Sequence, residues 1–366
     1  MPIRVIQIVE DLKVGGLERV IQSLALGLPK EKYDVKVWCL TKGGPVADEL
    51  QAAGIDVEIL GMGPRCTLPF LLKLRKKMRD SRADILHAHG YTACTIGRTA
   101  GFLANVPVIM AHVHSLYWGY TARQLFTEKI LSLVTDKVLC CSQAVAGFVI
   151  NREKINPGKV AVIYNGAADM GPRTASGTRA ALGLSPQDFA VGVVASLVEN
   201  KGHSYFLEAI REAAKTRPNI KAVLAGGGPL RGELEGLVKK LGIAGNVIFC
   251  GIVRDIGPFL SAVELVAQPS VEREGLSISI LEAMSAGRAV IGARVGGIPE
   301  AVTDGETGMI VPPRDPAALA AAILALAADR EKLEKMGRAA RIRYEEKFTL
   351  RHMIGGVAGV YEEFRG

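Results

Sequence analysis

Two glutamates, Glu274 and Glu282, lie eight residues apart in the second half of the chain, and Gly275 directly follows the first. A helix predicted to begin near Ser277 or Ser279 leaves Glu274 in the preceding loop and Glu282 in the first helical turns. Backbone N–H groups of such a loop and helix N-terminus can cradle a diphosphate. The flanking carboxylates can then accept hydrogen bonds from sugar and ribose hydroxyls. An acidic helix start that complements the helix dipole has the same residues, so the spacing alone leaves both interpretations open.

Lys201 lies in a second turn of this kind, which follows a strand predicted at 190–195 and is opened by Gly202. An ammonium group there can pair with a diphosphate and stabilise the negative charge that develops on a leaving group. A solvated surface lysine is the alternative.

A pair of glycines, Gly15 and Gly16, follows the first predicted strand and precedes a helix predicted at 17–28. Two glycines allow a helix N-terminus to approach a ligand closely, although a simple tight turn has the same composition. Their spacing is not G-x-G-x-x-G, so dinucleotide binding is poorly supported.

Four of the six histidines form two i, i+2 pairs at predicted strand ends, His87 with His89 and His112 with His114. Residues at this spacing share one face of a strand, so a metal site is one interpretation. We favour histidines that form hydrogen bonds and shape a cleft. The chain contains no Asp-x-Asp sequence for holding a cation on a diphosphate. We therefore expect Lys201, arginines and helix N-termini to meet the phosphate charge without a metal.

Short apolar runs of strand type alternate with helical patterns along the whole chain. The runs are continuous rather than alternating, which is typical of parallel strands covered on both faces. The chain is therefore predicted to be α/β, with doubly wound sheets. The predicted strands are 4–9, 34–40, 56–59, 84–89, 108–112, 137–141, 160–164, 190–195, 221–225, 247–250, 265–268 and 289–293.

The length of 366 residues favours two domains. Turn-forming residues concentrate at 167–178, where we place the linker. Residues 1–170 carry 21 Lys/Arg against 15 Asp/Glu, so this half is the more basic and suggests an anionic partner. Nucleic acid is disfavoured because only 5% of residues are aromatic.

The start of the chain is typical of a buried strand rather than of a secretory signal, and the apolar runs are too short to cross a bilayer. The six cysteines show no metal-binding spacing. We expect a cytoplasmic protein with reduced thiols.

A basic amphipathic stretch at 68–80 combines apolar residues at helical spacing with five cations: Lys73, Arg75, Lys76, Lys77 and Arg79. Such a helix can lie on the anionic inner face of a membrane. A helix that covers the sheet and has a solvated basic face is the alternative.

Several of these segments together resemble the glycosyltransferase group 1 family, also called family 4. The segment from Glu274 to Glu282 resembles the E-x7-E signature of this family. Six other segments resemble further family motifs and occur in the same order along the chain. These motifs begin at Val14 (VGGLERV), Asp84 (DILHAHG), Ile163 (IYNGA), Ser196 (SLVENKGH), Ala225 (AGGGPL) and Gly251 (GIVRD). The resemblance implies a GT-B fold, in which two Rossmann-like domains face each other across a cleft. It implies an acceptor-binding domain at 1–167, completed by a helix at 350–366, and a donor-binding domain at 168–349.

The resemblance also implies roles for single residues. Glu274 would contact the transferred sugar, and Lys201 would contact the diphosphate. His114, or His112 as the fallback, would contact the reacting end of the sugar. The donor would also be bound by Gly15, Gly16, Ser196, Arg254, Gly275, Leu276, Ser277 and Glu282. Leu276 and Ser277 depart from the commoner Phe and Gly, and Ser196 stands where many members have Arg.

The implied activity is retaining, metal-independent transfer of a hexose from a nucleotide diphosphate-sugar, UDP- or GDP-linked, to a glycan or lipid-linked acceptor. Cell-surface polysaccharide or lipopolysaccharide assembly is the expected setting. A nucleotide-sugar epimerase or phosphorylase of the same architecture and a non-catalytic nucleotide-sugar binding module are the alternatives.

Overall fold

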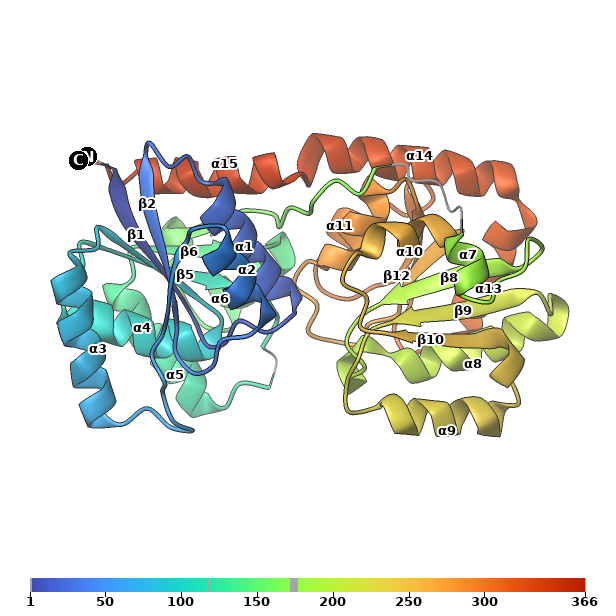
Figure 1. Ribbon diagram of the computed structural model, residues 1–366, viewed down its shortest axis with the longest axis horizontal. Coiled ribbons are helices and arrows are strands. Elements are labelled where there is room, and N and C mark those ends of the chain that lie inside the picture. Colours follow the sequence, from blue (N-terminus) through green and yellow to red (C-terminus); the bar gives the residue numbers. More distant parts are fainter. Residues whose placement is uncertain (1, 118, 172–176, 366) are drawn as a thin grey trace. The chain divides into compact units, whose positions relative to one another are not determined.

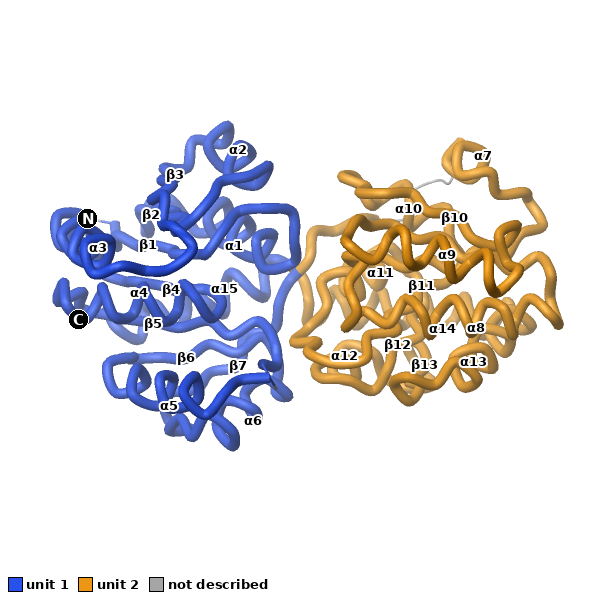
Figure 2. The backbone as a smooth tube through the Cα atoms, turned by 90° about the horizontal axis from the view of Figure 1, so that it is seen from below, with its two compact units in different colours: residues 1–166, 350–366 blue, residues 167–349 orange. Residues whose placement is uncertain are grey.

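The computed structural model describes residues 2–117, 119–171 and 177–365, so part of the linker predicted at 167–178 lies outside the described residues. The chain divides into two compact units, coloured separately in Figure 2. Unit 1 comprises Met1–Gly166 and Leu350–Gly366, and unit 2 comprises Ala167–Thr349. The sequence predicts the boundary after residue 167, whereas Ala167 already belongs to unit 2.

Unit 1 contains a parallel sheet with the strand order β3-β2-β1-β4-β5-β6-β7. Its strands are β1 Ile3–Val9, β2 Tyr33–Cys39, β3 Asp56–Ile59, β4 Ile85–His89, β5 Val108–Val113, β6 Lys137–Cys140 and β7 Val160–Val162. All five residues of β4 are buried. Burial on both faces favours continuous rather than alternating apolar runs, although β4 itself includes the buried His87 and His89.

Helices cover both faces of this sheet (Figure 1). Helix α4 packs on β1, β4 and β5 with α3 and α5 beside it, whereas α1 contacts α2 and the last helix, α15. The helices of unit 1 are α1 Gly16–Gly27, α2 Pro45–Ala52, α3 Leu68–Ser81, α4 Tyr91–Leu103, α5 Ala122–Leu131, α6 Gln143–Asn151 and α15 Leu350–Glu362.

Unit 2 contains a second parallel sheet with the strand order β10-β9-β8-β11-β12-β13. Its strands are β8 Phe189–Val194, β9 Ile220–Ala225, β10 Val247–Gly251, β11 Leu265–Gln268, β12 Ala289–Ala293 and β13 Gly308–Val311. Its helices are α7 Thr178–Ala181, α8 His203–Thr216, α9 Arg231–Leu241, α10 Ile256–Ala262, α11 Ile278–Ser285, α12 Ile298–Ala301, α13 Pro316–Ala328 and α14 Arg330–Lys347. Apolar residues of the sheet pack with those of α8, α9 and α13 into one core.

Strand β13 was not predicted. It is four residues long, and it begins with Gly308, where an added Cβ would lie 1.9 Å from the carbonyl oxygen of Val290. This close approach requires glycine, and glycine weakens the strand signal in the sequence.

Each sheet has a point at which the strand order reverses, between β1 and β4 in unit 1 and between β8 and β11 in unit 2. Doubly wound folds bind ligands at the carboxyl ends of the strands that flank such a point. The loops after these four strands are therefore the places to look for a site.

Candidate active site

In unit 2, the loops after β8 and β11 bring together two residues that the sequence singled out. Nζ of Lys201 lies 2.7 Å from Oε2 of Glu274. The glutamate is 6% exposed, and 23% of the lysine side chain is exposed. The two loops also meet through their backbones, because the N–H of Val271 donates to the carbonyl of Asn200 at 2.9 Å. The pair therefore consists of opposite charges in contact, largely shielded from solvent, at the switch point of the sheet.

The carboxylate of Glu274 is held by neutral donors as well. Oγ of Ser270 donates to Oε2 of Glu274 at 2.8 Å, and Nε2 of Gln268 approaches the same oxygen at 3.4 Å. Sequence reasoning missed Ser270 and Gln268, although Gln268 ends a predicted strand and Ser270 follows it two residues later, which is the available signal. These donors restrict the carboxylate to one orientation, as a group that contacts a substrate requires.

Helix α11 begins at Ile278, as the sequence predicts to within one residue, with Ser277 as its N-cap. No side chain in the described part of the chain caps this N-terminus. The hydroxyl of Ser277 pairs with that of Ser279 at 3.0 Å instead. Backbone N–H groups at this helix start are thus left for another partner, and an anion is the kind that the helix dipole favours.

The other predicted donor-binding residues of unit 2 lie on loops or a helix at the same carboxyl edge. Gly275 and Leu276 are buried just before α11, and Glu282 is half-buried within that helix. Ser196 is exposed after β8, and its carbonyl accepts a hydrogen bond from Nε2 of the buried His203 at 3.0 Å. Arg254 is exposed between β10 and α10. Lys201 and Glu274 are thus in direct contact, whereas Ser196 and Arg254 lie at the solvent side of the edge.

In unit 1, the glycine pair lies at the start of α1, with Gly15 as the N-cap. A Cβ on Gly15 would lie 2.3 Å from Oε2 of Glu18, so the glycine leaves room for that carboxylate. Burial raises the pKa of Glu18. The chain's own glutamate therefore approaches the helix N-terminus that we expected a ligand to approach.

His114 follows β5, and its Nε2 lies 3.1 Å from Nδ1 of His89 at the end of β4. Burial lowers the pKa of His114 to about 3, so its imidazole is neutral at physiological pH. His87 and His112 stack beside this pair. The structure thus brings all four predicted histidines together on one face of the sheet.

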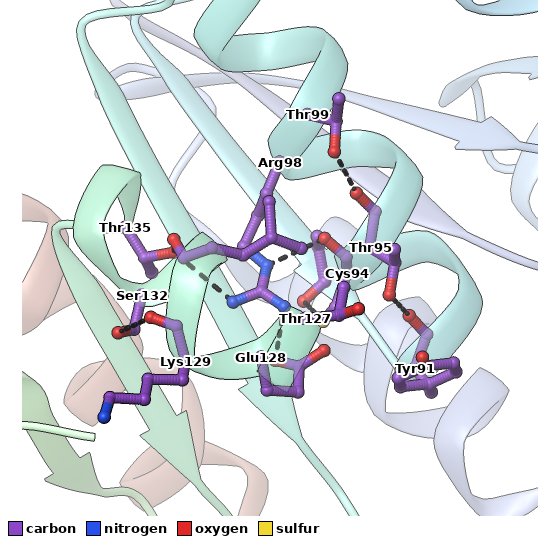
Figure 3. Close-up of polar contacts among 12 residues, drawn as sticks. Tyr91, Cys94, Thr95, Arg98, Thr99, Thr127, Glu128, Lys129, Ser132 and Thr135 are labelled. Atoms are coloured by element: carbon purple, nitrogen blue, oxygen red, sulfur yellow. Dashed lines mark hydrogen bonds and ion pairs between the residues drawn. The ribbon is translucent and has the colours of Figure 1, made fainter. Parts of the chain in front are cut away.

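The opposite face of the same sheet carries a polar cluster that sequence reasoning missed. The side chain of Arg98 on α4 is 0% exposed, and its guanidinium pairs with Oε2 of Glu128 on α5 at 2.5 Å (Figure 3). Arg98 also donates to the carbonyl of Cys94 and to Oγ1 of Thr135. Arg and Glu thirty residues apart on two helices leave no local sequence signal, because only packing brings them together.

The basic helix α3 buries Leu74 and Met78 against the rest of unit 1. Two of its five cations are engaged: Lys77 pairs with Glu58, and Nε of Arg75 donates to the carbonyl of Leu103. Lys73, Lys76 and Arg79 are exposed. Within the described residues, no helix combines the length and apolar character needed to cross a membrane.

Two parallel doubly wound sheets define the GT-B class of glycosyltransferases. Residues 14–168 match the family described as Glycosyltransferase Family 4, and residues 188–329 match Glycosyl transferases group 1. The chain therefore belongs to the group 1, or family 4, glycosyltransferases, which confirms the resemblance seen in the sequence.

Individual relatives support this assignment. The chain is 28% identical to the alpha-maltose-1-phosphate synthase of Mycolicibacterium smegmatis, over 95% of each protein. It is 26% identical to an Escherichia coli UDP-Gal:alpha-D-GlcNAc-diphosphoundecaprenol alpha-1,3-galactosyltransferase, over 78% of this chain and 77% of the relative. Among solved structures, HepE of Anabaena superposes with a TM-score of 0.90 at 23% identity, over 99% of this chain and 100% of HepE.

Proposed function

We propose that this glycosyltransferase moves a hexose, with retention at the anomeric carbon, from a nucleoside diphosphate sugar to a glycan or lipid-linked acceptor. The observation that carries the proposal is the contact between Lys201 and Glu274 beside the uncapped start of α11. This arrangement provides a cation and backbone N–H groups for a diphosphate, with a fixed carboxylate next to them.

In the proposed reaction, the bond between the anomeric carbon and the diphosphate oxygen breaks, and its electron pair leaves with the nucleoside diphosphate. The acceptor hydroxyl oxygen forms the new bond, and its proton leaves with the diphosphate. Lys201 and the α11 N–H groups stabilise the charge on the leaving group. Glu274 accepts hydrogen bonds from the sugar, Glu282 binds the ribose, and His114 contacts the reacting end of the sugar.

Two further features of the proposal concern the donor. We propose that no metal is required at the diphosphate, because Lys201, Arg254 and the α11 N-terminus can meet its charge. A UDP- or GDP-linked sugar is the proposed donor. HepE, whose fold this chain shares, has been crystallised with UDP-glucose, which supports a uridine nucleotide.

Substitution of Glu274 tests the proposal. Glu274→Gln keeps the size of the side chain but removes its charge. We expect transfer to fall by about 100-fold or more, a loss typical of a missing electrostatic contact in a transition state. Calorimetric titration with UDP, GDP and their sugars should show that nucleotide binding survives in this variant. Glu272→Gln, on the same loop but more exposed, is the matched control. Unchanged turnover in Glu274→Gln would refute the assigned role.

Product analysis separates the alternatives. An epimerase converts donor without any acceptor, a phosphorylase requires phosphate, and a binding module binds donor without turnover. Transfer of labelled sugar to a membrane extract, without divalent cations, supports the proposed reaction. Transfer that requires added magnesium or manganese would overturn the metal independence of the donor chemistry.

We further propose that an anionic membrane surface presents the acceptor to unit 1. Beside the exposed cations of α3, the apolar side chains of Leu68 and Leu72 are exposed on the same helix, and Phe102 is exposed at the end of α4. Helices α3 and α4 pack against each other. Exposed apolar residues next to lysines and arginines are typical of a surface that enters the headgroup region of a bilayer.

A further inference from the structure

The middle of the unit 1 sheet carries a row of buried polar side chains that the proposed reaction leaves unexplained. Strand pairing aligns Gln7 with His87 and His89 with His112 across β1, β4 and β5. Aligned residues on neighbouring strands, and residues two apart on one strand, project from the same face. All four side chains are between 0% and 1% exposed.

Most of the polar atoms in this row have no hydrogen-bond partner among the described residues. They are Nε2 of His87, Nε2 of His89, both ring nitrogens of His112, and both amide atoms of Gln7. Each buried polar group without a partner costs about 1–3 kcal/mol. So many on one patch indicate that the folded protein binds something there.

The three histidine rings lie close together. One nitrogen from each of His87, His89 and His112 lies within 4.8 Å of the other two. The three ring centroids are 4.2, 5.3 and 5.4 Å apart. Tetrahedral ligands about 2.0 Å from a zinc ion lie roughly 3.3 Å from one another, so ring rotations and small shifts would complete the coordination.

The second nitrogen of two of these rings is already held. Nδ1 of His87 lies 2.6 Å from the hydroxyl of Tyr361 on α15, and Nδ1 of His89 lies 3.1 Å from Nε2 of His114. Histidines that bind metals use one nitrogen as ligand and hydrogen-bond through the other, which sets the tautomer and ring orientation. The open Nε2 atoms of His87 and His89 are therefore the ones expected to bind a metal.

We propose that His87, His89 and His112 bind a divalent transition-metal ion, with zinc as the leading candidate and Oε1 of Gln7 as a fourth ligand. Neutral imidazoles favour zinc, copper or nickel, whereas magnesium and calcium require carboxylate or other oxygen ligands. The sequence left a metal site open for the histidine pairs but favoured hydrogen bonding, and the proposal reverses that preference for three of the four histidines. Full burial makes this a structural site, separate from the metal-free chemistry proposed for the donor diphosphate. The ion would fix β4 to β5 and hold His89 against His114.

Metal analysis of the untagged, full-length protein tests the proposal. The protein is first stripped with a chelator, then dialysed against zinc, and its metal content is measured by mass spectrometry. We expect one tightly held ion per chain and a higher Tm than in the stripped protein, because a ligand that binds the folded state stabilises it. Cobalt substitution should produce the visible absorption bands of a tetrahedral site with three nitrogen ligands and one oxygen ligand.

Three variants locate the ion. His89→Gln and His112→Gln should each lose it, while His352→Gln, an exposed histidine on α15, should retain it. Circular dichroism of each variant establishes that it is folded. Two results would overturn the proposal. The first is a folded wild-type protein that holds no stoichiometric metal, which would mean that water occupies the polar row. The second is an ion that both His89→Gln and His112→Gln retain.

Discussion

Gly202 lies against the backbone of Pro269, so close that a Cβ on the glycine would be 2.0 Å from the proline carbonyl oxygen. The φ angle of Gly202 is +70°, in the left-handed region that favours glycine. The contact joins the loop that carries Lys201 to the loop that carries Glu274. A residue without chemistry of its own thus sets the distance between the two residues proposed to act on the donor.

Gly202→Ala is therefore expected to separate these loops. Both the clash with fixed backbone and the strained φ angle oppose the change, and we expect a loss of about 1–3 kcal/mol in the free energy of unfolding. We also expect kcat/KM for transfer to fall at least tenfold, because Lys201 moves away from Glu274. Gly242→Ala is the control, since Gly242 has the same φ of +70° but nothing within 4 Å of an added Cβ. Equal effects of the two substitutions on kcat/KM would show that the contact with Pro269 is unimportant.

Removal of Arg98 should destabilise unit 1 strongly. Arg98→Met leaves the buried carboxylate of Glu128 without its ion-pair partner, and losses of about 3–5 kcal/mol are typical of such changes. The double variant Arg98→Met/Glu128→Gln removes both charges and should recover part of the loss. Denaturant titration of the two variants measures the difference. A double variant that is less stable than Arg98→Met alone would contradict this account.

Glu153 should make the protein less stable as the pH rises. Burial, followed by the nearby Glu128, raises the pKa of this 3%-exposed carboxyl from 4.5 to about 8. The folded state thus keeps a proton that the unfolded chain has released. The resulting stabilisation is fully present below pH 4.5 and is lost as the pH rises toward 8, at up to about 1.4 kcal/mol per pH unit.

Glu153→Gln mimics the protonated form and should remove this pH dependence. Urea titrations of wild type and variant between pH 5 and about 9 measure the difference. We expect the variant to gain relative stability with increasing pH. Parallel stability curves for the two proteins would mean that Glu153 is ionised in the folded state.

Binding to anionic vesicles should depend on the exposed cations of α3. The triple variant Lys73→Gln/Lys76→Gln/Arg79→Gln should sediment much less with phosphatidylglycerol vesicles than wild type does, because each cation near an anionic surface contributes about 1 kcal/mol. Salt should weaken wild-type binding. Lys239→Gln/Lys240→Gln on α9 removes neighbouring lysines from unit 2 and should have little effect. Equal sedimentation of the triple variant and wild type would remove the membrane from the proposal.

The sequence alone determined the fold class, and it predicted which loops carry the residues proposed to bind the donor. Continuous apolar strands, such as β8 and β12, are visible because both faces of each strand are buried, and burial favours apolar residues. Lys201 and Glu274 were singled out by their position in turns after predicted parallel strands together with the family resemblance, since such turns collect at one edge of a sheet. Strand β13 was missed because a short strand with a glycine at its start has little pattern.

Only the tertiary structure decided which side chains meet. The contact of Lys201 with Glu274 spans 73 residues, and that of Arg98 with Glu128 joins two helices. The histidines show this most clearly. Their i, i+2 spacing predicts a shared face within each strand, but only the register of β4 with β5 places His89 beside His112. Strands and helices can be predicted from the periodicity of nearby residues. A site also depends on which strands pair and which helices pack together, and nearby residues do not specify this.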